Sequence, residues 1–414
     1  MQALEADESF AKCALDNEYQ IHGHRNAEGM PVQVNDHCFN LEGGVEIGGH
    51  LRIVELTEAG FKTIEIDNSQ ADSTMVYNSN VDKTQMEDMN KLLQAFENNR
   101  NIKEKNFGYI SSFNFNSLAF YNKAWDDITC KARGLYIDKE HKQVVARSYD
   151  KFFNLNERPE TSLQALKKNL QYPVKAYVKV NGFLGIVGYD YRADKMIITS
   201  KSDMNGLYAK IFQSVLLSEL KDKVQYLKEY VKNNNCSVIF ECVDPIRDPH
   251  MIEYERAHVV LLEIVENTIN FKHKSYEDAV QLAINLGVKV KENAYTLHNW
   301  DEFNSWLEQI MKPDYQYKGA YIEGFVIEDA VGFMTKLKLR YYSYWKRMRH
   351  LAQTVLTKGA IQGRWKLDDA LSKNFYQWLQ QKVYPLRQAD GSYPFAIDII
   401  SLRKMYEKDI EYEE

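Results

Sequence analysis

Short apolar stretches separated by polar turns occupy the middle of the chain. Between residues 109 and 340 these stretches are rich in Val, Ile, Phe and Tyr, and glycine, asparagine or aspartate separates many of them. The pattern predicts β-strands at 135–137, 144–147, 174–180, 183–189, 196–199, 238–240, 259–265 and 324–327. Two longer segments, 207–232 and 276–286, have apolar residues at helical spacing. Because helices interrupt the strands without strict alternation, we expect an α+β fold with mainly antiparallel sheets.

The two ends of the chain have other patterns. Three segments near the C-terminus combine helical spacing of apolar residues with an absence of proline: 341–356, 367–383 and 398–412. Near the N-terminus, the pattern predicts short strands at 45–47 and 51–56 and a helix at 84–98.

The length of the chain suggests two to four structural units, since it has 414 residues. We therefore expect three parts. These are an N-terminal extension of unknown role (1–100), a central α+β domain (101–340) and a helical C-terminal domain (341–414).

Composition narrows the class of protein. Hydrophobic residues make up 44% and charged residues 27%, as in a folded globular protein. No apolar run approaches the ~18–20 residues that a membrane-spanning helix needs, and the acidic start does not resemble a secretory signal. Five scattered cysteines predict reduced thiols and a cytoplasmic protein with no membrane partner. The net charge of −6 argues against coating of nucleic acid by bulk attraction but allows a local basic cleft.

Lys179 is the first candidate for chemistry. It precedes Asn181-Gly182 between two apolar runs. Taken alone, this segment predicts a β-hairpin, because Asn-Gly is a favoured two-residue turn. The alternative is a lysine held at the end of a strand, beside a glycine that lets the backbone come close to a nucleotide. Such a lysine could attack the α-phosphorus of ATP if it were neutral, and nearby cations would lower its pKa.

Six further segments place charged residues beside apolar strand residues, in a fixed order around Lys179. They are 130–136, 146–157, 197–202, 238–242, 321–327 and 334–342. The series resembles the nucleotidyltransferase motifs of the phage-type RNA ligases, a group that includes the ligase domain of fungal tRNA ligase. The resemblance covers about 109–342. Lys-x-Asn-Gly alone is unspecific, whereas Asp-Lys-Phe-Phe-Asn-Leu-Asn-Glu at 150–157 is far more specific.

The resemblance implies that 101–340 is an adenylyltransferase domain and that Lys179 forms a phosphoramide with AMP. It also implies that Glu323 assists metal binding and positions the lysine, while Lys336 and Lys338 stabilise the departing pyrophosphate. The implied nucleotide contacts are Phe113, Arg133, Lys151, Lys201 and Glu241, with Glu241 also a metal ligand. Asn181 departs from the pattern, since some of these ligases have aspartate there. Asp244, Asp248 and His250 lie in a region that is variable in the family and receive no role.

Physical chemistry supports this set of residue types. Convergent Lys and Arg residues, together with Mg²⁺ or Mn²⁺, stabilise the charge that moves onto pyrophosphate. Lys336 and Lys338 are two residues apart, so on a strand they point to the same face. Each residue also has an ordinary explanation. Arg133 and Lys151 could form surface ion pairs, Glu323-Gly324 could be a simple turn, and the alternating lysines could be a solvated strand face.

The implied activity is ATP-dependent joining of RNA ends with a 5′-phosphate and a 3′-hydroxyl, in RNA repair or tRNA processing. The segment 340–350 mixes cations with aromatic residues, which suits either RNA contact or an amphipathic helix packed on the catalytic domain. No kinase or phosphodiesterase motif is evident, so a separate enzyme would heal the ends. The alternatives are a DNA ligase or capping-type nucleotidyltransferase, which usually has a β-barrel after the last lysine motif, and an inactive RNA-binding module.

Overall fold

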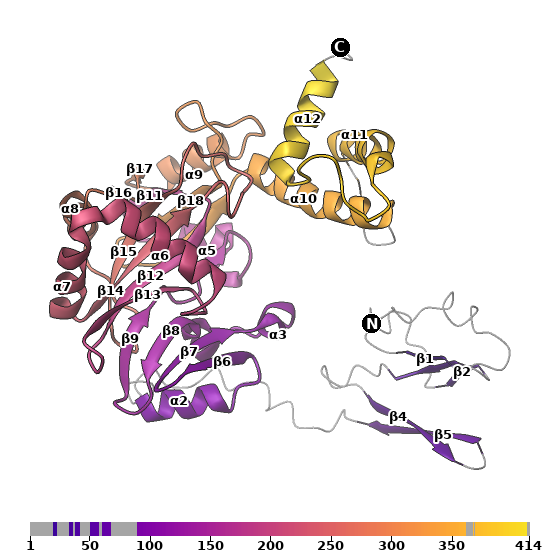
Figure 1. The fold of residues 1–414 in the computed structure, drawn as a ribbon, viewed down its shortest axis with the longest axis horizontal. Helices are drawn as coiled ribbons and strands as arrows, with labels where there is room; N and C mark the ends of the chain where they lie inside the picture. The colour runs from indigo at the N-terminus through magenta and orange to yellow at the C-terminus, as the bar shows by residue number, and fades with distance from the viewer. Residues whose placement is uncertain are drawn as a thin grey trace. The chain divides into compact units, whose positions relative to one another are not determined.

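The structure is a computed structural model that describes residues 20–22, 33–35, 38–41, 50–57, 60–67, 89–361, 367 and 369–411. The chain forms two compact units, Met1–Val81 and Asp82–Glu414 (Figure 1). The three-part division expected from the sequence stays a prediction. In the described part of the chain, no helix is long and apolar enough to cross a membrane.

The N-terminal unit contains two small sheets. The strands β4 (His50–Thr57) and β5 (Gly60–Asp67) form an antiparallel pair. In the other sheet, β3 (Cys38–Asn40) lies between β1 (Gln20–His22) and β2 (Gln33–Asn35). The strand expected at 51–56 is confirmed within β4, while the one expected at 45–47 lies outside the described residues.

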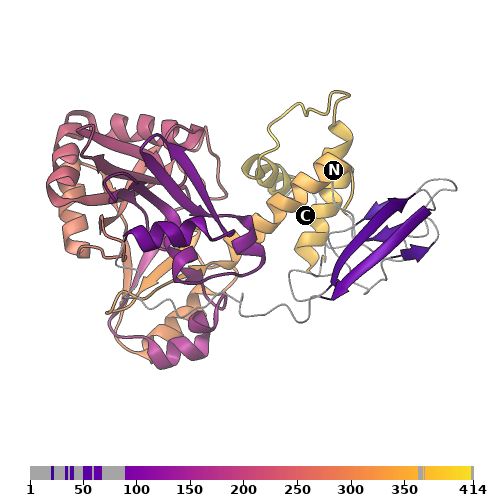
Figure 2. The same cartoon turned by 90° about the horizontal axis from the view of Figure 1, so that it is seen from below.

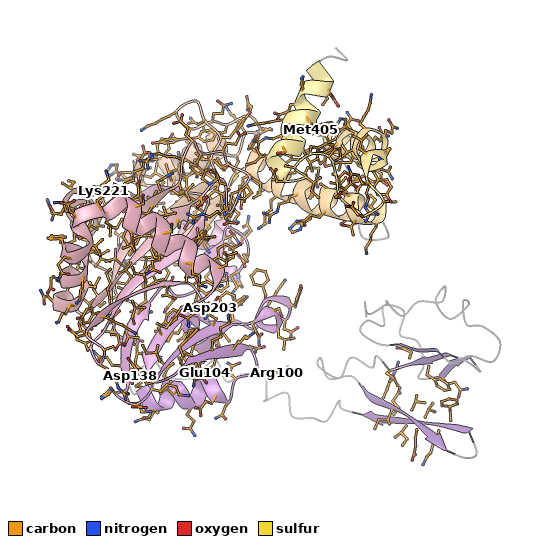
Figure 3. All side chains as sticks on the ribbon, viewed as in Figure 1. Arg100, Glu104, Asp138, Asp203, Lys221 and Met405 are labelled. Carbon is orange, nitrogen blue, oxygen red and sulfur yellow. The ribbon has the colours of Figure 1, made fainter. Side chains whose placement is uncertain are left out.

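The second unit begins with α2 (Met89–Glu97), which confirms the described part of the helix expected at 84–98. A four-stranded antiparallel sheet follows, in the order β6 (Ile102–Phe107), β7 (Ile110–Phe115), β8 (Arg133–Asp138) and β9 (Gln143–Arg147). The short helices α3 (Ser117–Tyr121) and α4 (Asp127–Lys131) connect β7 to β8. An ion pair of 2.8 Å joins Lys105 of β6 to Asp203, which follows the strand at Lys195–Ser200. Figure 3 labels Asp203 and Glu104, the residue before Lys105.

The next sheet has five strands in the order β13 (Lys195–Ser200), β12 (Phe183–Asp190), β14 (Cys236–Val243), β15 (His258–Glu266) and β16 (Lys289–Val290). Apolar residues on α6 (Leu207–Leu220), α7 (Val224–Asn234) and α8 (Tyr276–Leu286) pack against it. The single helix expected at 207–232 is instead broken at Lys221, whose φ of +51° ends α6.

A second five-stranded sheet has the order β10 (Phe153–Asn154), β19 (Met334–Lys338), β18 (Gly324–Glu328), β11 (Val174–Lys179) and β17 (Asn293–Leu297). It shares a core with α5 (Leu163–Asn169) and α9 (Trp300–Ile310). Most neighbouring strands in unit 2 are antiparallel, the exceptions being β10 with β19 and β15 with β16. The expected α+β fold with mainly antiparallel sheets is therefore confirmed.

The prediction of a β-hairpin at Asn181-Gly182 is wrong. The strands on either side of this turn, β11 and β12, belong to different sheets and do not pair with each other. β11 pairs with β17 and β18, far away in the sequence, whereas β12 pairs with the next strand, β13, and with the more distant β14. The chain therefore crosses from one sheet to the other directly after Lys179.

The chain ends in helices, as expected. They are α10 (Arg340–Lys358), α11 (Ala370–Trp378), which continues into a short π-helical turn (Leu379–Val383), and α12 (Ile399–Glu411). Both views show these helices gathered in one group (Figures 1 and 2). Their shared core includes Met348, Leu351, Phe375 and Leu402, and it also takes in Ile252 from the segment between β14 and β15.

Candidate active site

A cavity of about 420 Å³ lies between the two five-stranded sheets, in the size range of small-molecule sites. Strands from both sheets line it, and the crossing after Lys179 forms part of its wall. Eight of the nine site residues expected from the sequence line this cavity. They are Arg133, Lys151, Lys179, Lys201, Glu241, Glu323, Lys336 and Lys338.

Glu323 is the centre of the polar contacts in the cavity. Its Oε2 atom lies 3.0 Å from Nζ of Lys179, and its Oε1 atom lies 3.2 Å from Nζ of Lys338. The Nδ2 atom of Asn181 also donates to Oε2, at 2.9 Å. Glu323 is 3% exposed, so these three donors satisfy a carboxylate that would otherwise be buried without partners.

Strand register explains why these residues meet. Gly324 of β18 lies opposite Lys179 of β11 on one side and opposite Lys338 of β19 on the other. Gly324 has a φ of +154°, and a Cβ atom there would lie 1.9 Å from the carbonyl oxygen of Leu337. Only glycine fits this close approach of two strands. The strand β18 thus begins at a glycine that cannot be replaced without a clash, and the residue before it, Glu323, lies between Lys179 and Lys338.

Glu241 lies in β14 of the other five-stranded sheet and accepts a 3.0 Å hydrogen bond from the backbone amide of Gly182. A Cβ atom on Gly182 would lie 2.2 Å from the carbonyl oxygen of Cys242. The glycine therefore brings the crossing segment against β14, where the sequence suggested a close approach to a nucleotide. Burial raises the pKa of Glu241, and the nearby Glu323 carboxylate adds to this effect.

The charge state of Lys179 differs from the expectation that surrounding cations lower its pKa. Burial does disfavour the charged amine, but Glu323 and Glu241 outweigh burial and hold the pKa of Lys179 above its ordinary value. In this structure Lys179 is an ammonium group paired with Glu323. The expectation failed because the attraction of Glu323 and Glu241 for the charged amine exceeds the repulsion from Arg133.

Cations without carboxylate partners distinguish the rest of the cavity. In the described part of the chain, no carboxylate lies within 4.0 Å of the charged groups of Arg133, Lys201 or Lys336. Of the two residues for which the sequence had allowed a surface ion pair, Arg133 has none there, whereas Lys151 pairs with Glu157. Burial and the neighbouring Arg133 lower the pKa of Lys201 to about 8. Burial and the surrounding cations hold the pKa of Lys336 well below its ordinary value. Such mutual repulsion is unfavourable unless an anion enters.

The segment 150–157 connects Lys151 to Lys336. The amines of both lysines donate to the carbonyl oxygen of Phe152, at 3.2 Å and 2.9 Å. Lys151 also lies 3.9 Å from the ring centroid of Phe153 and 3.5 Å from Glu157. Parallel pairing of β10 with β19 brings the two lysines together across a long stretch of sequence. The motif at 150–157 thus fixes Lys151 and Lys336 at one side of the cavity.

Phe113 is the one expected site residue that the structure places elsewhere. It is 1% exposed and packs on Phe96 of α2 at a centroid distance of 4.8 Å. The pairing of β7 with β8 shifts register directly after Phe113, so simple alternation does not assign its face. Phe115 and Phe120 line the cavity instead.

The segment 340–350 lies in a helix with a buried face, as one of its two interpretations expected, while contact with RNA stays a prediction. Tyr342, Trp345 and Met348 of α10 are buried in contact with their neighbours. Lys346, on another face, lines the cavity, and burial beside Lys338 lowers its pKa. Lys346 was not singled out from the sequence, although it lies in the segment that was.

A second buried cluster that the sequence did not indicate borders the cavity. Lys291 lies 2.7 Å from Glu263 and 3.6 Å from Glu328, and His273 lies 3.2 Å from Glu328. Lys291 and Glu328 line the cavity beside Tyr177. These residues come from four separated segments, and no local spacing could have grouped them. Outside the cavity, His250 hydrogen-bonds Asp248 at 2.8 Å.

The carboxylates of Glu241 and Glu323 fit a divalent cation whose remaining ligands are water and phosphate oxygens. In the described ranges, no group of three or more His, Cys, Asp or Glu residues could enclose a metal ion. Mg²⁺ commonly takes one or two carboxylates and completes its shell with water and phosphate oxygens. Glu241 and Glu323 could supply those carboxylates, since both line the cavity.

Comparison with known proteins agrees with the geometry. The sequence model of the T4-type family described as "RNA ligase" matches residues 131–342, just over half of the chain. The tRNA ligase of Candida albicans is 24% identical over 361 residues, 77% of this chain and 43% of that protein. The tRNA ligase 1 of Schizosaccharomyces pombe is 27% identical over 214 residues, 47% of this chain and 26% of that protein. The chain thus spans less than half the length of these relatives.

Comparison with solved structures matches an archaeal ATP-dependent RNA ligase. It is 14% identical with a TM-score of 0.46, over 78% of this chain and 80% of that one. Another is a Naegleria gruberi RNA ligase variant described with ATP and manganese. It is 15% identical with a TM-score of 0.38, over 47% of this chain and 56% of that one. By its sequence match over residues 131–342, the chain belongs to the RNA ligase family of ATP-dependent covalent nucleotidyltransferases.

Proposed function

We propose that this chain is an ATP-dependent RNA ligase that joins 5′-phosphate and 3′-hydroxyl ends, with Lys179 as its nucleophile. One observation carries the proposal. The cavity holds an amine 3.0 Å from a buried carboxylate, together with three cations that have no carboxylate partner in the described part of the chain. That combination suits a lysine nucleophile next to a polyanion.

The first step is nucleotidyl transfer from ATP to Lys179. The neutral amine attacks the α-phosphorus, a P–N bond forms, and the P–O bond to pyrophosphate breaks. The amine must first lose its proton, because the ammonium ion has no lone pair. Arg133, Lys151 and Lys336 would stabilise the charge that gathers on pyrophosphate.

A divalent cation, Mg²⁺ or Mn²⁺, bound by Glu241 and Glu323 would offset the two carboxylates that raise the pKa of Lys179. Glu323 orients Lys179 and Lys338 at the same time, so the nucleophile and one phosphate contact share a single fixed group. At another part of the cavity, Leu262, Val326 and Met334 offer apolar surface for the adenine base.

Two further transfers complete the reaction. A 5′-phosphate oxygen of RNA attacks the phosphorus of the lysyl-adenylate, and Lys179 leaves with a proton. This forms a 5′–5′ pyrophosphate linkage. A 3′-hydroxyl then attacks the RNA 5′-phosphate, a phosphodiester forms and AMP departs. Lys346 lines the cavity from α10 and would contact the RNA that enters.

The names of the relatives favour tRNA among the possible substrates. The matched proteins from Candida albicans and Schizosaccharomyces pombe are both tRNA ligases. We propose a role in tRNA processing or RNA repair in the cytoplasm, with a separate enzyme healing the ends. The thiols of Cys130, Cys236 and Cys242 are free, which fits a reducing compartment.

Label transfer tests the proposal. The protein is incubated with α-labelled ATP or GTP and Mg²⁺, denatured, and assayed for retained label. We expect label from ATP, none in Lys179→Ala, and normal labelling in Lys175→Ala, a lysine on the same strand that does not line the cavity. Preference for GTP would indicate a capping-type enzyme, and absence of label would indicate an inactive binding module. Transfer of label to 5′-phosphorylated RNA but not DNA would establish the substrate class.

A further inference from the structure

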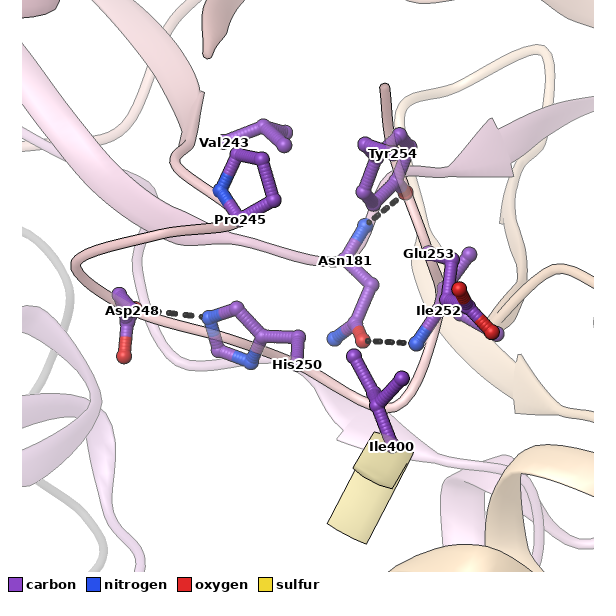
Figure 4. Close-up of a pocket in the computed structure, with 9 residues that line it drawn as sticks. All are labelled: Asn181, Val243, Pro245, Asp248, His250, Ile252, Glu253, Tyr254 and Ile400. Atoms are coloured by element: carbon purple, nitrogen blue, oxygen red, sulfur yellow. Dashed lines mark hydrogen bonds and ion pairs between the residues drawn. The ribbon is translucent and has the colours of Figure 1, made fainter. Parts of the chain in front are cut away.

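Asn181 connects the nucleophile to a segment outside the cavity. Its side chain donates to Glu323 through Nδ2 at 2.9 Å and accepts from the backbone amide of Ile252 through Oδ1 at 3.3 Å. Its own backbone amide donates to the hydroxyl of Tyr254 at 2.9 Å (Figure 4). Asn181 is 3% exposed, so these contacts fix its side chain. The position of Glu323, and with it Lys179, therefore depends on where residues 251–254 lie.

Helix α12 holds that segment from the other side. Nη1 of Arg403 donates to the carbonyl oxygen of Met251 at 2.9 Å, and Nη2 lies 2.6 Å from Oε1 of Glu253. Arg403 is 5% exposed and also lies over the rings of Tyr341 and Trp345, at 5.6 Å and 5.7 Å from their centroids. One buried guanidinium thus joins α12, α10 and residues 251–254.

Packing and polar contacts both hold this segment, since Met251 and Ile252 are buried in the core shared with the C-terminal helices. A cavity of about 160 Å³ lies beside Asn181, between the 244–254 segment and Ile400 of α12 (Figure 4). Beside this unfilled space, Arg403 adds directional contacts that fix the Met251 carbonyl and the Glu253 carboxylate. A displaced segment would withdraw the Ile252 amide, the donor that orients the Asn181 side chain.

We propose that Arg403 is a positioning residue for adenylyl transfer, acting from the C-terminal helices through residues 251–254 and Asn181 on Glu323 and Lys179. The proposal rests on the proposed function, because it assigns a cause to the rate of lysyl-adenylate formation. Arg403 touches neither the cavity nor the reacting atoms. Loss of Arg403 leaves Arg133, Lys151 and Lys336 in place, so nucleotide binding persists while the geometry of attack is lost.

The test compares Arg403→Met with the matched control Lys404→Met. Lys404 pairs with the other carboxylate oxygen of Glu253 at 2.5 Å, but its side chain is 61% exposed. Among the hydrogen bonds of the described residues, the Met251 carbonyl accepts from Arg403 and not from Lys404. Single-turnover labelling with α-labelled ATP gives the rate constant at saturation and the half-saturating concentration. We expect the Arg403→Met rate constant to fall about 10–100-fold, as when a group that orients a catalytic residue is removed. The half-saturating ATP concentration should stay within about twofold.

A double-variant cycle separates positioning from general destabilisation. If Arg403 acts through Asn181, the rate of Arg403→Met with Asn181→Ala should match that of Asn181→Ala alone. Glu253→Gln, at a more exposed position, weakens the same link and should slow labelling to a smaller degree, which keeps the test valid if Arg403→Met does not fold. Thermal unfolding checks that each variant is folded at the assay temperature.

Two results would overturn the proposal. One is a folded Arg403→Met or Glu253→Gln protein with the rate of the unaltered chain. The other is a double variant in which the two losses simply multiply. Failure of the proposed function has a different signature, since the unaltered protein would then take no label from ATP.

Discussion

The Oε2 atom of Glu323 lies 3.0 Å from the Nζ atom of Lys179, although 144 residues separate the two in the chain. This contact orients the amine and also keeps it protonated, because Glu323 is the main carboxylate that raises the pKa of Lys179. The resting site is therefore ordered for attack but holds its nucleophile in the unreactive form. Substrate binding must change that balance.

Substitution of Glu323 by glutamine should weaken both the orientation of the Lys179 amine and the retention of its proton. We expect Glu323→Gln to slow lysyl-adenylate formation by about 10²–10³, comparable with the loss of one charge-stabilising contact. The remaining slow reaction should reach half its maximal rate at a lower pH than in the unaltered protein. The reason is that loss of the Glu323 carboxylate lowers the pKa of the Lys179 amine. Labelling rates from pH 6 to pH 10 measure this. An unchanged rate and pH dependence would contradict the assigned role of Glu323.

Lys336 should destabilise the protein while serving the reaction. It is surrounded by Arg133, Lys151, Lys179 and Lys338, and its pKa is held well below the ordinary value. Replacement by methionine keeps the bulk and removes a buried charge that has no carboxylate partner in the described part of the chain. We expect Lys336→Met to raise the melting temperature and to slow labelling by about 10²–10³. Lys195→Met, at an exposed position of β13, is the control and should change neither. A lower melting temperature in Lys336→Met would argue that this cation stabilises the free protein.

Lys201 should make nucleotide binding depend on pH. Its pKa is about 8, so the amine is charged below that pH and neutral above it. Affinity for ATP should therefore fall as the pH rises from 7 to 9. Lys201→Arg should flatten this fall, because arginine stays charged. ATP titrations at several pH values measure the effect. The same slope in both proteins would show that another group is responsible.

Gly324 should be intolerant of any side chain. A Cβ atom there would lie 1.9 Å from the Leu337 carbonyl oxygen, and the φ of +154° is rare for other residues. We expect Gly324→Ala to lower the free energy of unfolding by more than the roughly 1–3 kcal/mol of backbone strain alone, and to abolish labelling. Gly319→Ala separates the two contributions, since Gly319 has a φ of +77° but open space around it. Denaturant titration compares them, and equal losses would show that the contact with Leu337 is unimportant.

The amino-acid sequence determined the inventory of the site and the type of fold. The ordered motifs named eight residues that line one cavity, because residue identity and strand alternation are local properties. The helices α10, α11 and α12 near the C-terminus were predicted in the same way, from the spacing of apolar residues. Phe113 was expected at the site from the resemblance alone, and packing against Phe96 of α2, which only the folded chain reveals, holds it in the core.

Only the tertiary structure decided how those residues act on one another. Whether Asn181-Gly182 closes a hairpin or crosses between sheets depends on which distant strands supply hydrogen-bond partners. Whether the pKa of Lys179 rises or falls depends on distances to charges from several strands, since electrostatic interactions weaken with separation. The link from Arg403 to Asn181 likewise joins segments far apart in the chain. Local patterns record what each residue is, whereas pairing and electrostatics are set by proximity in the folded chain.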